Sequence, residues 1–177
     1  MKDLHQFYDA LFEPIAERMG SLDADTIVSI IGFDAGGPLN LCTVGYGKQA
    51  FVTYVSCELA LRDDQRIGDD GPYELMVVCN DEDWARNVLT GIARLGLEAQ
   101  LAGGHTIDIS ALVGRGSAIQ GAVLEEFASV KIRRRHYRIL LVHGVSGHEL
   151  ARARDQGAVA WLKARRAASA YPQTSVR

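Results

Sequence analysis

Apolar side chains recur at the three- and four-residue spacing of one helical face between residues 4 and 19. Charged and amide side chains fill the opposite face, as in an amphipathic helix. Gly20 tolerates a positive φ and is a natural residue to end this helix. Pro14 lies in mid-segment and lacks a backbone N–H, so it predicts a kink or a break there.

The next part of the chain has the pattern of β-strands. Two short apolar runs, residues 26–31 and 41–46, read as strands, and residues 73–79 are apolar enough for a central one. Residues 51–62 alternate with a period of two, and Tyr54, Glu58 and Arg62 share one face. That face is either a solvated outer face or a contact surface. A polar loop follows to residue 72.

The second half predicts further helices and strands. Asn80 or Asp81 caps a helix with acidic side chains in its first turn, and Gly96 ends it. Strands are predicted for three apolar runs: residues 105–110, 119–127 and 137–143. Ser146 and Glu149 match a capping box that opens one last helix. The tail after residue 170 is expected to fray.

These elements predict one α/β (α+β) domain, a mixed and mostly antiparallel sheet flanked by helices. Residues 1–24 would be an N-terminal helix packed on the domain, residues 25–170 the domain itself, and residues 171–177 a tail. A chain of 177 residues buries roughly 70% of its unfolded surface, enough for one core. No apolar run approaches the ~18 residues of a membrane span, and no apolar leader opens the chain.

The cysteines lie far apart, each in an apolar run. Cys42, Cys57 and Cys79 form no CxxC pair, so neither a zinc site nor a redox pair is predicted. Three buried, reduced thiols are the simplest interpretation. Together with the missing leader, they predict a cytoplasmic protein.

Charge is distributed unevenly although the net charge is -3. Residues 1–89 carry 6 basic and 16 acidic side chains, whereas residues 90–177 carry 13 basic and 6 acidic side chains. The most basic run is residues 131–138. Such clustering steers a charged partner, unless the two sets neutralise each other on the folded surface. One short basic run in an acidic protein argues against nucleic-acid binding.

Three near-motifs fail their structural test. Residues 45–50 approach a dinucleotide-binding GxGxxG/A, but a strand rather than a helix follows, which favours a hairpin turn. Residues 144–148 nearly spell the nucleophile elbow GxSxG, but the last glycine is missing and no histidine follows His148. Residues 148–152 read HELAR rather than HExxH. We therefore predict no catalytic centre, cofactor or metal site.

Several stretches resemble the bacterial branch of the suppressor of fused domain family. They are residues 51–62, 71–75, 80–84, 104–108 and 137–157, the last being a closing strand followed by VSGHEL and a helix. The similarity spans roughly residues 25–165 and rests on structural residues, with no catalytic signature.

The resemblance implies one α/β domain with a mixed sheet between helices, and no cofactor. The animal member is a cytoplasmic inhibitor that sequesters a transcription factor in Hedgehog signalling. Bacterial relatives are associated with toxin neutralisation as immunity proteins, or have no assigned role. The animal protein clamps its ligand between two domains, whereas this sequence shows no second domain, so neither that binding mode nor that ligand is carried over.

The leading hypothesis is a non-enzymatic module that binds a protein partner, as an inhibitor or an immunity-like protein. Exposed charge and aromatic character select eight candidate contacts: Tyr54, Glu58, Arg62, Asp63, Asp64, Arg133, Arg134 and Arg135. One alternative is a small cytoplasmic hydrolase or transferase that uses Ser146, Cys57 or His105. Another is a homo-oligomer with a structural role. No contact with nucleic acid or membrane is expected.

Overall fold

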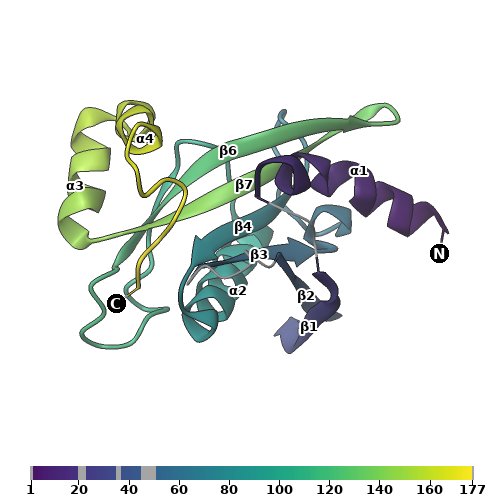
Figure 1. Ribbon diagram of the computed structural model, residues 1–177, viewed down its shortest axis with the longest axis horizontal. Coiled ribbons are helices and arrows are strands. Elements are labelled where there is room, and N and C mark those ends of the chain that lie inside the picture. The colour runs from purple at the N-terminus through teal and green to yellow at the C-terminus, as the bar shows by residue number, and fades with distance from the viewer. Residues whose placement is uncertain (1, 20–22, 35–36, 45–50, 177) are drawn as a thin grey trace.

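The computed structural model describes residues 2–19, 23–34, 37–44 and 51–176. Four α-helices, seven strands and one 3-10 helix occur in this part of the chain (Figure 1). In order they are α1 (Lys2–Met19), β1 (Asp23–Asp34), β2 (Gly37–Val44), β3 (Val52–Cys57), the 3-10 helix η1 (Leu59–Leu61), β4 (Tyr73–Cys79), α2 (Glu82–Glu98), β5 (Thr106–Asp108), β6 (Gly121–Ile132), β7 (Arg135–Val145), α3 (Gly147–Gln156) and α4 (Ala158–Arg166).

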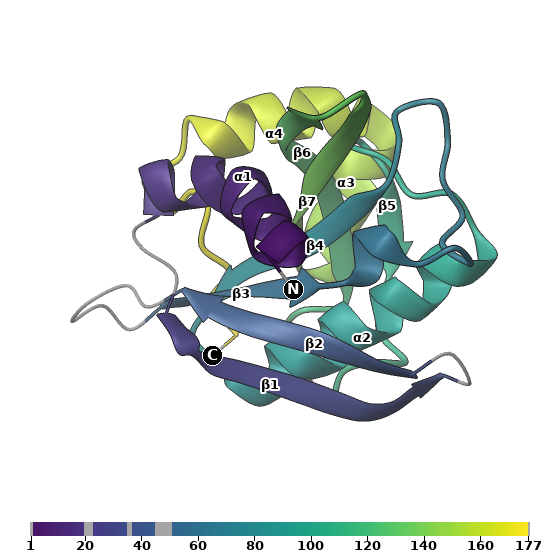
Figure 2. The ribbon, with the colours of Figure 1, turned by 90° about the vertical axis from the view of Figure 1, so that its right-hand side faces the viewer.

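The seven described strands form one sheet in the order β1-β2-β3-β4-β7-β6-β5 (Figure 2). Only β4 and β7, at the centre, pair in parallel, and the other neighbours are antiparallel. The fold prediction of a single α/β domain with a mixed, mostly antiparallel sheet is therefore confirmed.

Helices cover both faces of the sheet, and the alternation of β4 explains how. Leu75 and Val77 pack in the cluster that contains the apolar face of α2. Met76 and Val78 point the other way, into the cluster that contains the apolar face of α1. On that same face β6 and β7 carry a third cluster, where Trp161 of α4 packs. The chain thus buries a helix layer on each side of its central strands.

The strand predicted over residues 51–61 is shorter than expected. β3 ends at Cys57, because Glu58 takes a left-handed conformation with φ of 73° and the chain turns into η1. Both faces of β3 are buried, so the two-residue alternation did not mark a solvated face. Tyr54 and Glu58 consequently do not share an exposed strand surface.

Two helices also differ from their predicted bounds. α1 continues through Pro14, because the burial of its apolar face against the sheet outweighs one missing backbone hydrogen bond. α2 continues past Gly96 to Glu98. Gly96 leaves room for the hydroxyl of Tyr73, which a Cβ at this position would overlap. Glycine here serves close packing rather than a helix end.

The predicted last helix is divided in two. The capping box of Ser146 and Glu149 is present and opens α3. The helix is followed by Gly157, which has a positive φ of 86° that glycine adopts without strain. α4 starts immediately after this residue. After the break, α4 buries Trp161 and Leu162 in the cluster that contains Val123 of β6.

The prediction that the tail after residue 170 frays is wrong. Thr174 is 1% exposed and forms a parallel bridge with Cys79 beside the sheet. Its N–H donates to the carbonyl oxygen of Val78 at 2.7 Å, and its hydroxyl accepts from the N–H of Gly144 at 3.0 Å. Composition alone gave no sign of these hydrogen bonds.

Thr174→Ala is expected to lower the free energy of unfolding by about 1 to 2 kcal/mol, since the buried N–H of Gly144 loses its acceptor. Urea unfolding measures the change. Ser169→Ala, at an exposed position in the same segment, is the control and should leave stability unchanged. Equal stability of the two variants would show that the tail is not held by this bond.

Candidate functional site

The β6–β7 hairpin ends in a basic turn. Ile132 pairs with Arg135 at the last rung of the ladder, so Arg133 and Arg134 form the turn. Arg133 has a φ of 58°, a left-handed conformation that costs a residue with a side chain roughly 1 kcal/mol. Figure 1 shows that the turn of the β6–β7 hairpin extends beyond the ends of the other strands of the sheet. Arg133, Arg134 and Arg135 are all exposed there.

A groove lies between this turn, the first turns of α1 and the end of η1. Its volume is about 760 Å³. Five apolar or aromatic residues line it: Leu4, Phe7, Leu61, Ile132 and Tyr137. Gln6 and the three arginines complete the lining that the structure describes, and no acidic residue is among these described lining residues. We call this hollow the arginine groove.

The floor of the arginine groove is aromatic and partly open to solvent. The rings of Phe7 and Tyr137 meet edge to face with centroids 4.8 Å apart. Arg135 places its guanidinium 5.8 Å from the centroid of the Tyr137 ring. Leu4 is 40% exposed and Leu61 42% exposed. An apolar surface of this kind beside fixed cations is able to hold a ligand that combines apolar and anionic groups.

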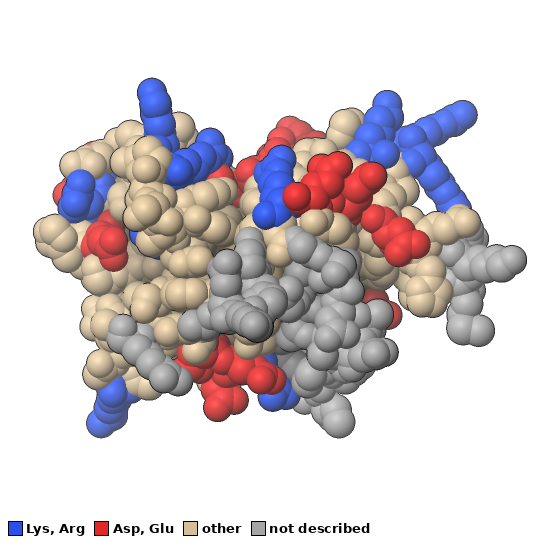
Figure 3. All heavy atoms as spheres, in the orientation of Figure 1, with Lys and Arg blue, Asp and Glu red and all other residues tan. Residues whose placement is uncertain are grey.

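Of the eight predicted contact residues, the structure gathers Arg133, Arg134 and Arg135 at the arginine groove. Figure 3 shows Lys and Arg side chains projecting together at this end of the molecule. The other five do not line the groove: Tyr54, Glu58, Arg62, Asp63 and Asp64. Leu61, next to them in sequence, does line it.

Arg62 and Asp64 are bonded to each other. The guanidinium of Arg62 donates to both carboxylate oxygens of Asp64, at 2.9 and 2.8 Å. The hydrogen bond from Arg62 holds the pKa of Asp64 below its usual value. Arg62 also stacks over Phe33, with 5.4 Å from its guanidinium carbon to the ring centroid. Asp63 is exposed.

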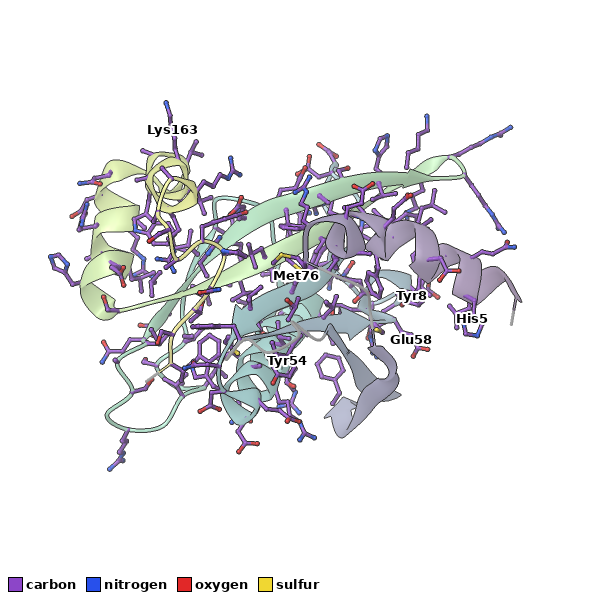
Figure 4. The ribbon with its side chains drawn as sticks, viewed as in Figure 1. His5, Tyr8, Tyr54, Glu58, Met76 and Lys163 are labelled. Atoms are coloured by element: carbon purple, nitrogen blue, oxygen red, sulfur yellow. The ribbon has the colours of Figure 1, made fainter. Side chains whose placement is uncertain are left out.

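Tyr54 is not a surface residue. It is 6% exposed and packs in the cluster beneath α2, and burial raises its pKa to about 12. The expectation of an exposed aromatic is wrong because α2 covers that face of β3. Figure 4 shows Tyr54 inside the molecule, and Glu58 close to Tyr8 of α1. The backbone N–H of Glu58 donates to the hydroxyl of Tyr8.

A buried carboxyl group joins the elements behind the arginine groove. Glu74 of β4 is fully buried and accepts hydrogen bonds from Ser56 at 2.6 Å, from the N–H of Ala60 at 3.0 Å and from Tyr8 at 3.2 Å. Burial raises its pKa to about 8, although the hydrogen bonds from these groups oppose the shift. A pKa of about 8 favours the protonated form of this carboxyl group at neutral pH. It ties α1 and η1 to the sheet.

A second buried polar network fixes the C-terminal segment. His143 Nε2 lies 2.6 Å from Glu125, which also accepts from Arg166 at 2.5 Å and from Tyr171 at 3.2 Å. Burial lowers the pKa of His143, against the effect of the carboxylate. Burial alone would raise the pKa of Glu125, but the hydrogen bonds from His143 and Arg166 lower it. A neutral His143 imidazole that donates a hydrogen bond to an ionised Glu125 carboxylate is consistent with the lowered pKa of both groups.

Neither network was predicted from the sequence. The sequence signal for the Glu74 network was an acidic residue inside the apolar run YELMVVC. The signal for the second network was an acidic residue, Glu125, and a histidine, His143, in two apolar strands. A charged residue inside a central strand needs a buried partner. Which partner it finds depends on pairings between distant segments.

His143→Gln is expected to weaken the pH dependence of stability. Because the folded protein lowers the pKa of His143, the unfolded chain binds a proton at this residue more readily than the folded protein does as pH falls below 6.5. The melting temperature should therefore fall from pH 7 to pH 5, and fall less in the variant. His148→Gln, at an exposed histidine, is the control. Parallel pH profiles for His143→Gln and the unsubstituted protein would contradict this assignment.

The residues of the hydrolase hypothesis serve structural roles or lie apart. The hydroxyl of Ser146 donates to Glu149 at 2.9 Å and accepts from the N–H of the same residue, inside the capping box. Cys57 is disulfide-bonded, so the prediction of a reduced thiol there is wrong. Cys79 is a free, buried cysteine, and burial raises its pKa to about 11. His105 lies on an exposed turn before β5.

Within residues 2–19, 23–34, 37–44 and 51–176, no group of three His, Cys, Asp or Glu side chains is placed to hold a metal ion. Among the described helices, none combines the length and the apolar character that a membrane crossing requires. The glycine-rich residues 45–50 lie outside the described residues.

The fold is similar to that of part of Suppressor of Fused. The chain is similar to a chain of the Sufu-Fu complex crystal structure, with a TM-score of 0.73 and 16% identity over 98% of this chain and 89% of that one. It is also similar to Drosophila Suppressor of Fused, with a TM-score of 0.66 and 14% identity over 96% of this chain. This chain spans about half of the length of Drosophila Suppressor of Fused, 49%. No protein-family model and no curated protein sequence matches the chain.

Proposed function

We propose that this chain is a non-enzymatic protein-binding module of the suppressor of fused type, which acts by sequestering or inhibiting a protein partner. The observation that carries the proposal is the arginine groove, where aromatic floor and arginine rim meet. Aromatic residues and arginine are enriched in protein–protein interfaces and dominate their binding energy. A toxin is one such partner, and the chain would then act as an immunity-like protein.

The fold likeness supports the same class of function. A protein of this fold has been crystallised in a complex named for Sufu and Fu. What we carry over is the class of ligand, a protein, and not Fu itself. A binding module needs a stable scaffold with a formed surface. The hydrogen bonds of the buried Glu74 contribute to such a scaffold, because they connect α1 and η1, which line the arginine groove, to the sheet.

Co-expression with each protein encoded by a neighbouring gene, followed by affinity purification and light scattering, tests this function. The expected result is a complex of fixed stoichiometry with one of them. It should form at low salt and weaken at 1 M salt, because exposed charges are then screened within roughly 3 Å. Elution of the chain alone with every candidate, at every salt concentration, would contradict the proposal.

A further inference from the structure

We propose that the arginine groove binds an acidic segment of the partner that carries large apolar side chains, an inference that rests on the proposed protein-binding function. The occupant would lie between α1, η1 and the hairpin turn. Its apolar side chains would cover the floor, and its carboxylates would pair with the rim.

The apolar part of the argument comes from exposure. Within the described residues, four large hydrophobic side chains are more than a third exposed: Leu4, Leu61, Ile67 and Val159. Two of them, Leu4 and Leu61, come from segments far apart in sequence and line the same groove. They join the partly buried Phe7 and Tyr137 in one surface. Covering such a surface with an apolar ligand removes it from water and favours binding.

The charge part comes from the lining. Three arginines line the groove and no acidic side chain is among its described lining residues, although the net charge of the protein is -3. Guanidinium groups bind carboxylates through two parallel hydrogen bonds. A nucleic acid would offer phosphates to the arginines and bases to the aromatic rings, but the aliphatic Leu4, Leu61 and Ile132 match apolar side chains better than they match bases. An acidic peptide segment with apolar side chains matches both the arginines and this floor.

The size and stiffness of the groove fit a short segment. A volume of about 760 Å³ lies within the usual range of ligand sites and accommodates a few side chains rather than a domain. Tyr8, directly after Phe7 in α1, bonds both to Glu74 and to the N–H of Glu58, which precedes η1. The two walls are therefore held in place before a ligand arrives, which lowers the entropy cost of binding.

A displayed library of random 12-residue peptides, selected on the purified full chain, provides the test. We expect enriched peptides to carry Asp or Glu next to Leu, Phe or Trp. A synthetic enriched peptide should bind the double variant Arg134→Glu, Arg135→Glu at least about 10-fold more weakly, as expected for reversed charge pairs. A second peptide with its acids changed to Lys should prefer that variant. Leu61→Asp, at an exposed position, should also weaken the first peptide.

The matched control is the double variant Arg115→Glu, Arg152→Glu, at exposed arginines outside the groove, and it should bind the first peptide normally. Enrichment without acidic residues, or unchanged affinity after reversal at 134 and 135, would overturn the inference. Stronger competition by a single-stranded oligonucleotide, or self-association that alone fills the groove, would also overturn it. If a co-expressed partner still binds the reversed variant, the proposed function stands and this surface is wrong.

Discussion

Glu74→Gln is expected to raise the stability of the protein at pH 9 while changing it little at pH 5. The buried carboxyl group has a pKa of about 8, against 4.5 for an ordinary glutamic acid. The folded protein thus holds a proton that the unfolded chain releases between these two values. Stability contributed by this group is fully present below pH 4.5 and is lost as pH rises through 8. Glutamine is neutral throughout and keeps a similar shape.

The expected size of the effect follows from the width of that pH window. The full shift corresponds to roughly 5 kcal/mol, of which roughly 4 kcal/mol falls between pH 5 and pH 9; both values are upper limits, since structural relaxation reduces them. Guanidinium unfolding at both pH values measures it. Glu98→Gln, at an exposed position, is the control and should follow the unsubstituted protein. A stability loss for Glu74→Gln that is the same at both pH values would show that Glu74 is ionised in the folded state.

The second large effect is expected for Arg138→Ala, with a loss of about 3 kcal/mol or more in the free energy of unfolding. Arg138 of β7 is 2% exposed. Its guanidinium donates to the carbonyl oxygen of Gly71 at 2.8 Å and lies 3.5 Å from Asp70. It also stacks over Tyr73, 5.6 Å from the ring centroid. Truncation leaves a cavity and removes the donor that holds the loop before β4.

Arg86→Ala is the matched control for Arg138→Ala. Arg86 pairs with Glu82 on the surface of α2 at 3.6 Å, and exposed pairs one helical turn apart contribute less than about 0.5 kcal/mol. Urea unfolding should therefore separate the two variants clearly. Arg138→Lys should fall between them, because lysine keeps the charge but not the planar fork. Equal losses at both positions would mean that the buried arginine has no special role.

Local patterns predicted the elements that depend on short stretches of sequence. The apolar stripe gave α1, the apolar run gave the central β4, and Asp81 caps α2 by accepting from the N–H of Trp84. The capping box gave the start of α3. Each of these signals lies within one or two turns of chain, so no distant residue is needed to read it.

Features that depend on distant segments were not predictable. The alternation around Tyr54 indicated an exposed face, but α2 covers it in the folded chain. Thr174 is held by Val78 and Gly144, which no pattern in the tail reveals. The arginine groove itself joins residues 4–7, 61 and 132–137. Its arginines were predicted as contacts, whereas its floor needed the tertiary structure.

The basic run of residues 131–138 illustrates both outcomes. Arg133, Arg134 and Arg135 are exposed together, because a tight hairpin turn leaves consecutive side chains in solvent. Arg138, three residues further on, enters the central part of the sheet and faces Asp70 from the acidic half of the sequence. Charges of the two halves therefore meet where the buried Arg138 reaches the exposed Asp70, while the hairpin turn keeps its positive charge at the surface.

Native mass spectrometry of the purified complex with a co-expressed partner tests most directly whether the chain acts by binding alone. The account predicts one species of fixed stoichiometry, in which both proteins have the masses calculated from their sequences. The contradicting result would be a change in the mass of the partner after incubation with a small, substoichiometric amount of this chain. Such a change would require this chain to catalyse a chemical reaction.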